Sequence, residues 1–502
     1  MTLPNSPSAT LRSQIAELEA TLALQREEAE KAAFHHKRLI NGTENQLAAL
    51  HEQLASTTYP VETVPPEILS EIFRSYQRQN GCGNPFDNRS SPIPLTQVCR
   101  TWRRLALSMF ELWTSLAIYL DGRLPPGPVL QRGVVDWFAR AGKRDLEIMV
   151  MGDEGDDIDL ADLQPLFVQF APRLKMLSIE DSSADIIEEM NTWNLHFPVL
   201  LDAILYVGLG YDMHETNLEL LHNAPKLDSL TLFNVTLQNE FLDVPEQWRK
   251  LTKLVLQGSV YTAECVGALK GLPALRVLEV TIGPNDPTWT QVPYLHPALE
   301  ELEATFEEPE AANAAVFLRA FTFPCLRKLP RALPVSIADE RVLSAFLQRS
   351  SPPLRELSLR GPSIETLRMF TEKCPGLSDL RIHRPRVQLV THFFDSWESD
   401  PGFCAALEHV TFVLSNDALY TYPPSETAAL ASIELFVERT ADAVNKRRAL
   451  CGSQFCLRSL KVHCYLPRYL GFLFSEEKMR GLRKLRDEGL NIVFGSFKNP
   501  VF

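Results

Sequence analysis

The 502-residue chain lacks the features that mark membrane and exported proteins. No apolar run approaches the roughly eighteen residues that a membrane-spanning helix requires, so we expect no membrane partner. The first residues, MTLPNSPSATLRSQ, contain no basic leader followed by an apolar block, which argues against a secretory signal. We therefore expect a cytoplasmic or nuclear protein.

Positive charge is also scarce. The 50 Lys and Arg residues are outnumbered by 63 Asp and Glu residues, which gives a net charge of −13. Proteins that bind the phosphate backbone concentrate basic residues on one face, so nucleic acid is not an expected partner.

Known catalytic and metal-binding motifs are missing as well. The chain has no GxxxxGK[ST] loop, no GxSxG turn and no HExxH pair, so we expect neither an enzyme nor a cofactor. Nine cysteines are scattered without close CxxC pairs, which favours reduced thiols over disulfides or zinc. The acidic run at 153–159 lacks the Gly and the final Glu of a calcium loop and predicts a solvated turn.

What the sequence does contain begins with a predicted long helix over residues 11–57, preceded by a disordered segment at 1–10. Leu11, Ile15, Leu18 and Leu22 alternate at spacings of four and three, as in a coiled-coil seam. The seam is then interrupted by polar residues, namely Gln25, His36, Thr43 and Gln46. Self-association through 11–54 and a solvated single helix both remain open.

Apolar residues gather next in the region 60–120. The segment PPEILSEIFRSY predicts an amphipathic helix that begins at Pro66. Residues 77–94 are rich in Gly, Asn, Ser and Pro and predict an exposed loop, after which QVCRTWRRLA and LW predict a second helix and its continuation. So small a helical core is marginally stable alone, which leaves two alternatives for its apolar residues: a surface for a partner, or packing within the module itself.

The order of these segments resembles the F-box, the helical module that docks substrate receptors onto SCF-type ubiquitin ligases. The longer loop between the helices is similar to the expanded form seen in mushroom-forming fungi. The resemblance implies contact with the SCF adaptor subunit and, through it, with the cullin scaffold. The matching adaptor-binding positions are Pro66, Ile68, Leu69, Ile72, Val98 and Trp102.

After a predicted linker at 121–133, the sequence motif Leu-x-x-Leu-x-Leu, called the leucine phrase below, recurs through residues 134–502. Examples are APRLKMLSI (171–179), APKLDSLTL (224–232) and SPPLRELSL (351–359), and the first leucines recur every 23–30 residues. This period predicts an α/β leucine-rich repeat solenoid, a horseshoe of strands backed by helices. LEIMVM (146–151) is the expected first strand and 482–494 the last helix and strand, with the helical module capping the start.

Two irregularities are expected in this array. Pro330 falls inside a predicted strand and should distort its repeat, because proline cannot donate to the ladder. A predicted helix at 426–447 interrupts the repeats and could bulge from the horseshoe, which leaves the repeat count between 407 and 457 open.

Alternate strand residues point away from the leucine core and predict a concave binding surface. Its charge runs from acidic or neutral in early repeats to basic in later ones, and a bound protein should carry the opposite gradient. An ordinary solvated face is the alternative. The predicted target-binding residues are Phe233, Glu279, Glu303, Arg360, Arg381 and His383.

Together with the repeats, the F-box resemblance implies a non-catalytic substrate receptor of an SCF-type ubiquitin ligase, with an adaptor at its helical module and an unidentified target protein on its concave face. A leucine-rich interaction scaffold that works without the ligase is the alternative. Co-purification of the cullin distinguishes the two.

Overall fold

The structure is a computed structural model of the whole chain. It describes residues 7–56, 64–120, 125–152, 160–181, 185–207, 218–233, 246–284, 292–334, 340–414, 426–464 and 476–495. The fold is α/β, with a long N-terminal helix, a small group of helices and a large parallel sheet. Within the described ranges, no helix is both long and apolar enough to cross a bilayer.

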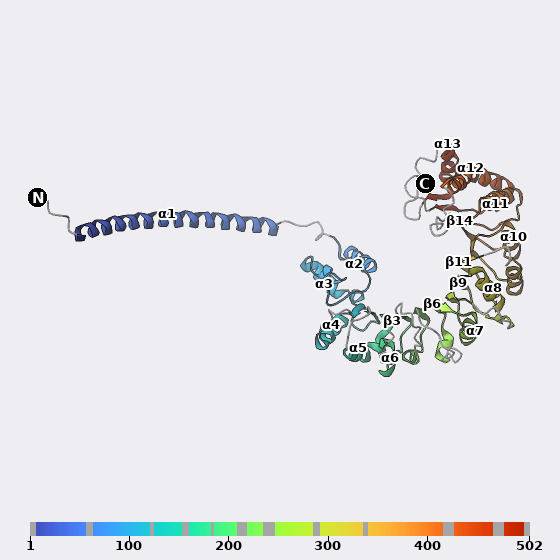
Figure 1. Cartoon of the computed structure of the whole chain (residues 1–502), viewed down its shortest axis with the longest axis horizontal. Helices are drawn as coiled ribbons and strands as arrows, with labels where there is room; N and C mark the ends of the chain where they lie inside the picture. Colours follow the sequence, from blue (N-terminus) through green and yellow to red (C-terminus); the bar gives the residue numbers. More distant parts are fainter. Residues whose placement is uncertain are drawn as a thin grey trace.

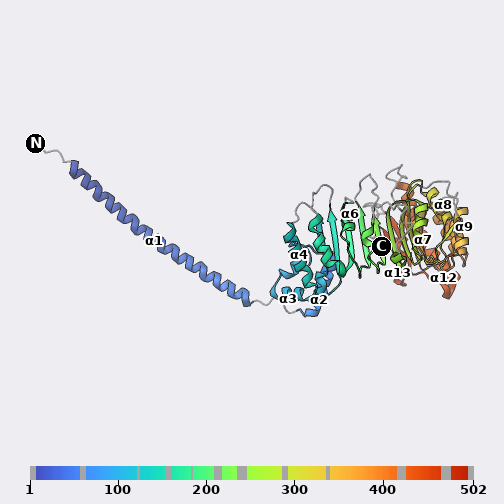
Figure 2. The same ribbon diagram turned by 90° about the horizontal axis from the view of Figure 1, so that it is seen from below.

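The N-terminal helix α1 (Pro7–Ser56) extends away from the rest of the chain in both views (Figures 1 and 2). It confirms the predicted long helix but begins earlier, so residues 7–10 are helical rather than disordered. Proline is tolerated at a helix start because its missing N–H has no partner there in any case. Residues 1–6 lie outside the described residues.

A helical module spans residues 64–113. It consists of α2 (Pro66–Asn80), the short 3₁₀ helices η2 (Ile93–Thr96) and η3 (Phe110–Trp113), and α3 (Arg100–Ser108). The predicted start of α2 is confirmed. The second helix begins later than predicted, since Cys99 is its N-cap and Val98 precedes it.

The loop between these helices is less exposed than predicted. Ser91 is buried, and Gly83 forms a parallel bridge to Leu116 with its carbonyl accepting from the Ala117 N–H at 2.7 Å. A Cβ on Gly83 would stand 2.3 Å from the Trp137 ring, so a glycine allows this close approach. The loop therefore fastens the module to the edge of the sheet.

Among the described residues, the large sheet has 14 strands, all parallel and arranged in sequence order from one edge to the other. The strands are β1 (Ser115–Leu120), β2 (Leu146–Gly152), β3 (Leu174–Asp181), β4 (Asp202–Val207), β5 (Ser229–Phe233), β6 (Lys253–Val260), β7 (Val277–Ile282), β9 (Glu301–Phe306), β11 (Lys328–Pro334), β12 (Glu356–Arg360), β13 (Asp379–His383), β14 (His409–Leu414), β15 (Ser459–Cys464) and β16 (Asn491–Gly495). A separate two-stranded sheet pairs β8 (Tyr294–Leu295) with β10 (Phe321–Thr322).

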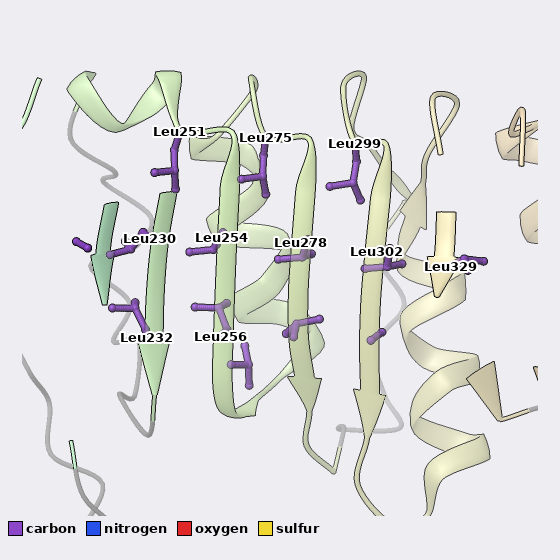
Figure 3. Close-up of a cluster of buried hydrophobic side chains, with 14 of the residues drawn as sticks. Leu230, Leu232, Leu251, Leu254, Leu256, Leu275, Leu278, Leu299, Leu302 and Leu329 are labelled. Carbon is purple, nitrogen blue, oxygen red and sulfur yellow. The ribbon is translucent and has the colours of Figure 1, made fainter. Parts of the chain in front are cut away.

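The repeated leucines account for the strand positions. From β4 to β15, each strand of the large sheet begins two residues after the first leucine of its phrase, and those leucines are buried. Figure 3 shows the labelled leucines of neighbouring strands lying in rows across the sheet. Leu177, Ile179, Leu357 and Leu359 are fully buried, which confirms their predicted inward direction.

Helices carry the chain from one strand to the next at most steps of the sheet, since parallel strands need a crossover connection. The described part of the β7–β9 connection contains β8 instead. The helices are α4 (Gly127–Arg140), α5 (Gln164–Phe170), α6 (Asp185–Thr192), α7 (Thr262–Gly271), α8 (Glu310–Ala320), α9 (Glu340–Ser350), α10 (Ile364–Lys373), α11 (Val387–Ser399), α12 (Glu426–Cys451) and α13 (Glu476–Asp487). Figure 1 shows the strands lining the inner side of an arc and the helices covering its outer side. The inner side is the concave face.

Several predicted boundaries need correction. Residues 127–133, predicted as linker, form the first half of α4, which buries Leu130 against the core. LEIMVM lies in β2, while the first strand is β1, inside the region assigned to the helical module. The helix at 426–447 is confirmed within α12, but it does not interrupt the sheet, because β14 and β15 pair directly.

The core is continuous from the helical module to the end of the sheet. One cluster of buried side chains runs from Phe73 through Leu116 to Ile492. At the junction, the rings of Trp113 and Trp137 meet edge to face at 4.9 Å, and Trp137 donates its indole N–H to the Ser115 carbonyl at 3.2 Å. The module is therefore packed onto the first strands.

Candidate protein-binding surfaces

Helix α2 carries apolar residues on two faces. Leu69 and Phe73, one turn apart, are 2% and 0% exposed and face the core. Ile68 and Ile72, also one turn apart, are 54% and 46% exposed. Packing within the chain explains the first pair and leaves the second pair in solvent, together with the neighbouring Pro66.

The start of α3 also has one apolar residue packed against the core and another in solvent. The Trp102 ring meets Phe73 edge to face at 4.9 Å and is half-buried. The Cys99 thiol accepts from the Trp102 N–H at 3.5 Å and caps the helix. Val98, just before the cap, is 55% exposed.

The six predicted adaptor-binding positions therefore fall into two groups, exposed and packed. Pro66, Ile68, Ile72 and Val98 are exposed, and we call them the exposed aliphatic set. The predicted role of Leu69 in adaptor binding is corrected, because its buried side chain offers no surface to a partner. Trp102 serves mainly as packing for Phe73.

Charged side chains fix the orientation of α2. Arg74 donates to Glu71 on its own helix and to Glu111 in η3, at 2.5 Å and 3.1 Å. These interactions raise the pKa of Arg74, first through Glu71 and then through Glu111. They hold the inner face of α2 toward η3.

A second candidate surface lies on the concave face, where four of the six predicted target-binding residues line one pocket of about 510 Å³. They are Glu303 on β9, Arg360 on β12, and Arg381 and His383 on β13. Glu279 on β7 pairs in register with Glu303, next to the pocket. Phe233, on β5, is half-buried and is not among the pocket residues.

The pocket forms where β11 departs from regular pairing. Between Leu329 and Leu333, β11 advances four residues while β12 advances two, from Leu357 to Leu359. The extra residues include Pro330 and Arg331, which line the pocket. The distortion predicted from Pro330 is therefore confirmed, and the bulge interrupts the concave face at this repeat.

Charged neighbours shift the pKa of a titratable group on each side of this pocket. Partial burial, and next the Glu279 carboxylate, raise the pKa of Glu303. On the opposite side, burial followed by the charges of Arg360, Arg381 and Arg384 lowers the pKa of His383. The β7–β9 side thus carries Glu279 and Glu303, and the β12–β13 side carries Arg360 and Arg381.

Ion pairs balance part of this charge. Arg360 donates to both carboxylate oxygens of Glu310 at 2.5–2.7 Å. Arg381 lies 3.6 Å from Glu356, and Arg331 lies 4.0 Å from Glu279. One guanidinium nitrogen makes both short contacts to Glu310, and this pair is stronger than the two longer pairs, which can exchange for a ligand at small cost.

Sequence reasoning missed three charged residues of the pocket: Glu310, Arg331 and Arg384. Glu310 starts a helix and Arg384 follows the end of β13, so neither occupies an alternating strand position. Arg331 lies in the bulge, and the proline beside it was the available signal.

Several concave positions are more buried than the alternation predicts. Ser178 and Ser358 are 0% exposed, and Val255 is 4% exposed. These positions therefore offer little surface to a ligand.

Three of the described cysteines are buried, namely Cys265, Cys374 and Cys404. Burial raises the pKa of Cys265 to about 12, and burial raises the pKa of Cys374 and Cys404 to about 11. These groups stay protonated at neutral pH and are poor nucleophiles or metal ligands. Within the described ranges, no three His, Cys, Asp or Glu side chains could hold a metal ion, and the acidic run at 153–159 lies outside those ranges.

Comparison with known proteins supplies no relative. No protein-family model matches the chain, and a search of curated proteins finds no similar sequence.

Proposed function

We propose that this chain is a substrate receptor of an SCF-type ubiquitin ligase, with an F-box-like module at residues 64–113 and a leucine-rich repeat solenoid behind it. It would hold the adaptor subunit with the module and a target protein with the concave face. The chain itself would perform no bond chemistry.

One observation carries the proposal, namely the second apolar face of α2. A helix of 15 residues that already buries Leu69 and Phe73 has no internal use for Ile68 and Ile72. Exposed aliphatic side chains on a small module suit a protein interface, where they become buried on binding. Their positions match those implied by the F-box resemblance.

The repeat assignment is supported by regularity. A leucine phrase predicts each strand from β4 to β15 at a constant offset, and the helices between the strands lie on one side of the sheet. Such a stack leaves the other side of the sheet for ligands.

The test is a pull-down of the full chain from an extract of its source organism, comparing the wild type with an Ile68→Lys, Ile72→Lys double variant. Loss of a buried apolar anchor costs about 2 kcal/mol or more, so adaptor and cullin should be lost from the variant. Because both side chains are exposed, its thermal unfolding should match the wild type.

A matched control is Val129→Lys with Val168→Lys. These valines are 54% and 56% exposed on the outer helices α4 and α5. The control should keep both subunits. Adaptor bound without cullin would favour the ligase-independent scaffold, and adaptor retained by the Ile68, Ile72 variant would overturn the assigned interface.

A further inference from the structure

The concave pocket between β9 and β13 combines an acidic side and a basic side within one surface. Glu303 and Glu279 form the acidic side, and Arg381 and Arg384 belong to the basic side. In a chain with a net charge of −13, a site that gathers four arginines, Arg331 and Arg360 included, is a local exception.

The register places these charges in one row across the sheet. Glu301 pairs with Lys328, Lys328 with Glu356, and Glu356 with Asp379. Glu303 lies two residues after Glu301 on β9, and Arg381 lies two residues after Asp379 on β13. Because alternate residues of a strand share a face, Glu303 and Arg381 belong to the next row on the same concave face.

The separation of the two charges can be obtained from strand spacing. The strand order β9, β11, β12, β13 puts three steps between Glu303 and Arg381. At about 4.8 Å per step this is roughly 14 Å, the length of about four residues of extended peptide. A single small ion cannot contact both Glu303 and Arg381 at this separation, whereas an extended peptide that crosses the strands can.

We propose that this pocket binds an extended segment of the target protein that carries a cationic side chain about four residues from an anionic one. The cation would lie against Glu303 and Glu279, and the anion against Arg381 and Arg384. This proposal rests on the proposed function, because it assumes that the concave face receives a protein.

The pocket's internal pairs suit such an exchange. The Arg381–Glu356 and Arg331–Glu279 pairs are long, at 3.6 Å and 4.0 Å, and leave their arginines about half exposed. Arg360 is held by both oxygens of Glu310 and forms a fixed wall between the two sides. At Arg381, an incoming carboxylate or phosphate therefore competes with a long, partly exposed ion pair.

The test measures binding of short fluorescein-labelled peptides to the full chain by fluorescence polarisation. One peptide carries arginine and aspartate about four residues apart in a neutral background, and others have the same composition with shorter or longer separations. A parallel set replaces aspartate by phosphoserine, which distinguishes an acidic from a phosphorylated source of the anion. We expect the four-residue separation to bind best in both sets.

Charge reversal gives the sharper result. Arg381→Glu should weaken the arginine–aspartate peptide at least about tenfold and should gain affinity for a peptide with two arginines. Glu303→Arg should instead favour a peptide with two acidic residues. A variant that had merely lost its fold would gain neither preference.

The matched control is Lys461→Glu, which reverses a charge on β15 in the same row but outside the pocket. It should leave peptide binding unchanged. Wild-type binding that ignores the separation, equal binding of the two-acid peptide or of inorganic phosphate, or no binding by any peptide would overturn the proposal.

Failure here can be told apart from failure of the proposed function. Peptide binding is measured on the isolated chain without the adaptor, and adaptor capture depends on Ile68 and Ile72 in the helical module. A chain that captures adaptor but binds no peptide refutes only the pocket assignment. A chain that captures no adaptor but binds the peptide refutes only the ligase assignment.

Discussion

Adjacent residues on α2 have opposite roles, and this difference can be measured. Leu69 is 2% exposed and Ile68 is 54% exposed. We expect Leu69→Ala to lower the free energy of unfolding by about 2–5 kcal/mol, because it leaves a cavity in the core. Ile68→Ala should change it by about 0.5 kcal/mol or less.

Chemical denaturation of the two variants tests this contrast directly. Equal destabilisation would mean that Ile68, too, is packed, and Ile68 would no longer belong to the exposed aliphatic set. The sequence could not separate the two residues, because both are large aliphatics within one short helix. Only the position of η3 and α3 around α2 decides which face is buried.

His296 makes stability depend on pH. It is fully buried, its Nε2 lies 3.0 Å from the Leu272 carbonyl oxygen, and Tyr294 is the titratable ring packed beside it. Its Nδ1 is buried without a hydrogen-bond partner among the described residues. Burial lowers the pKa of His296, while the bond to Leu272 acts weakly in the opposite direction.

The direction of this pH dependence follows from the linkage between protonation and folding. Below the ordinary histidine pKa of about 6.5, the unfolded chain takes up a proton that folded His296 resists, so stability falls as pH falls toward the lower folded value. One proton contributes at most about 1.4 kcal/mol per pH unit. The melting temperature should therefore drop between about pH 7.5 and about pH 5.5.

A His296→Gln variant separates this residue from His383, whose pKa is also lowered by burial. The variant should be less stable at neutral pH but should lose less stability on acidification than the wild type. The same loss in both proteins would assign the pH dependence elsewhere.

At the scale of elements, α1 presents an unpacked apolar stripe. Leu11, Ile15, Leu18 and Leu22 are each about half exposed or more. Beyond the polar interruptions of the seam, Ile40, Leu47, Leu50 and Leu54 are exposed as well. A helix of 50 residues would be about 75 Å long and gains stability in water mainly by packing. A second copy of the same helix can cover this stripe.

We therefore expect the full chain to sediment at twice the mass of one chain and a Leu18→Lys, Leu22→Lys variant at the mass of one. Leu24→Lys is the control, because Leu24 is 60% exposed but lies outside the alternating register. A monomeric wild type would leave α1 as a solvated single helix.

Most elements of the sheet could be predicted because each phrase contains its own positional signal. Leu299, for example, fixes where β9 begins, two residues later. Strand β1 was missed because Ser115–Leu120 follows FELW without a preceding leucine phrase. The first half of α4 was missed because Pro128 and its neighbouring glycine favour a loop locally, although Leu130 and Trp137 bury on folding.

At the scale of the whole molecule, the pocket and the continuous core both depend on contacts between distant segments. Pro330 indicated a distortion but not a cavity, since the cavity requires β9, β12 and β13 to lie around the bulge. In the same way, nothing in residues 60–120 indicates that Gly83 will pair beside β1.

The continuous core predicts that the helical module and the first strands unfold together. Trp137 links them, since it contacts Trp113, donates to Ser115 and closes over Gly83. We expect hydrogen exchange of the full chain under mild denaturant to protect α2, α3 and β1–β3 to a similar free energy. Trp137→Ala should lower that protection in all of them, by about 3–5 kcal/mol, and should affect β14–β16 less.

Earlier exchange in α2 and α3 than in β1–β3 would contradict this prediction and would describe a module tethered to the sheet. Joint exchange has a functional consequence, because a module that shares its core with the sheet cannot rotate against it. Any protein bound through Ile68 and Ile72 would then be held in one orientation relative to the concave pocket. Rigid presentation of this kind lowers the entropic cost of bringing two bound proteins together.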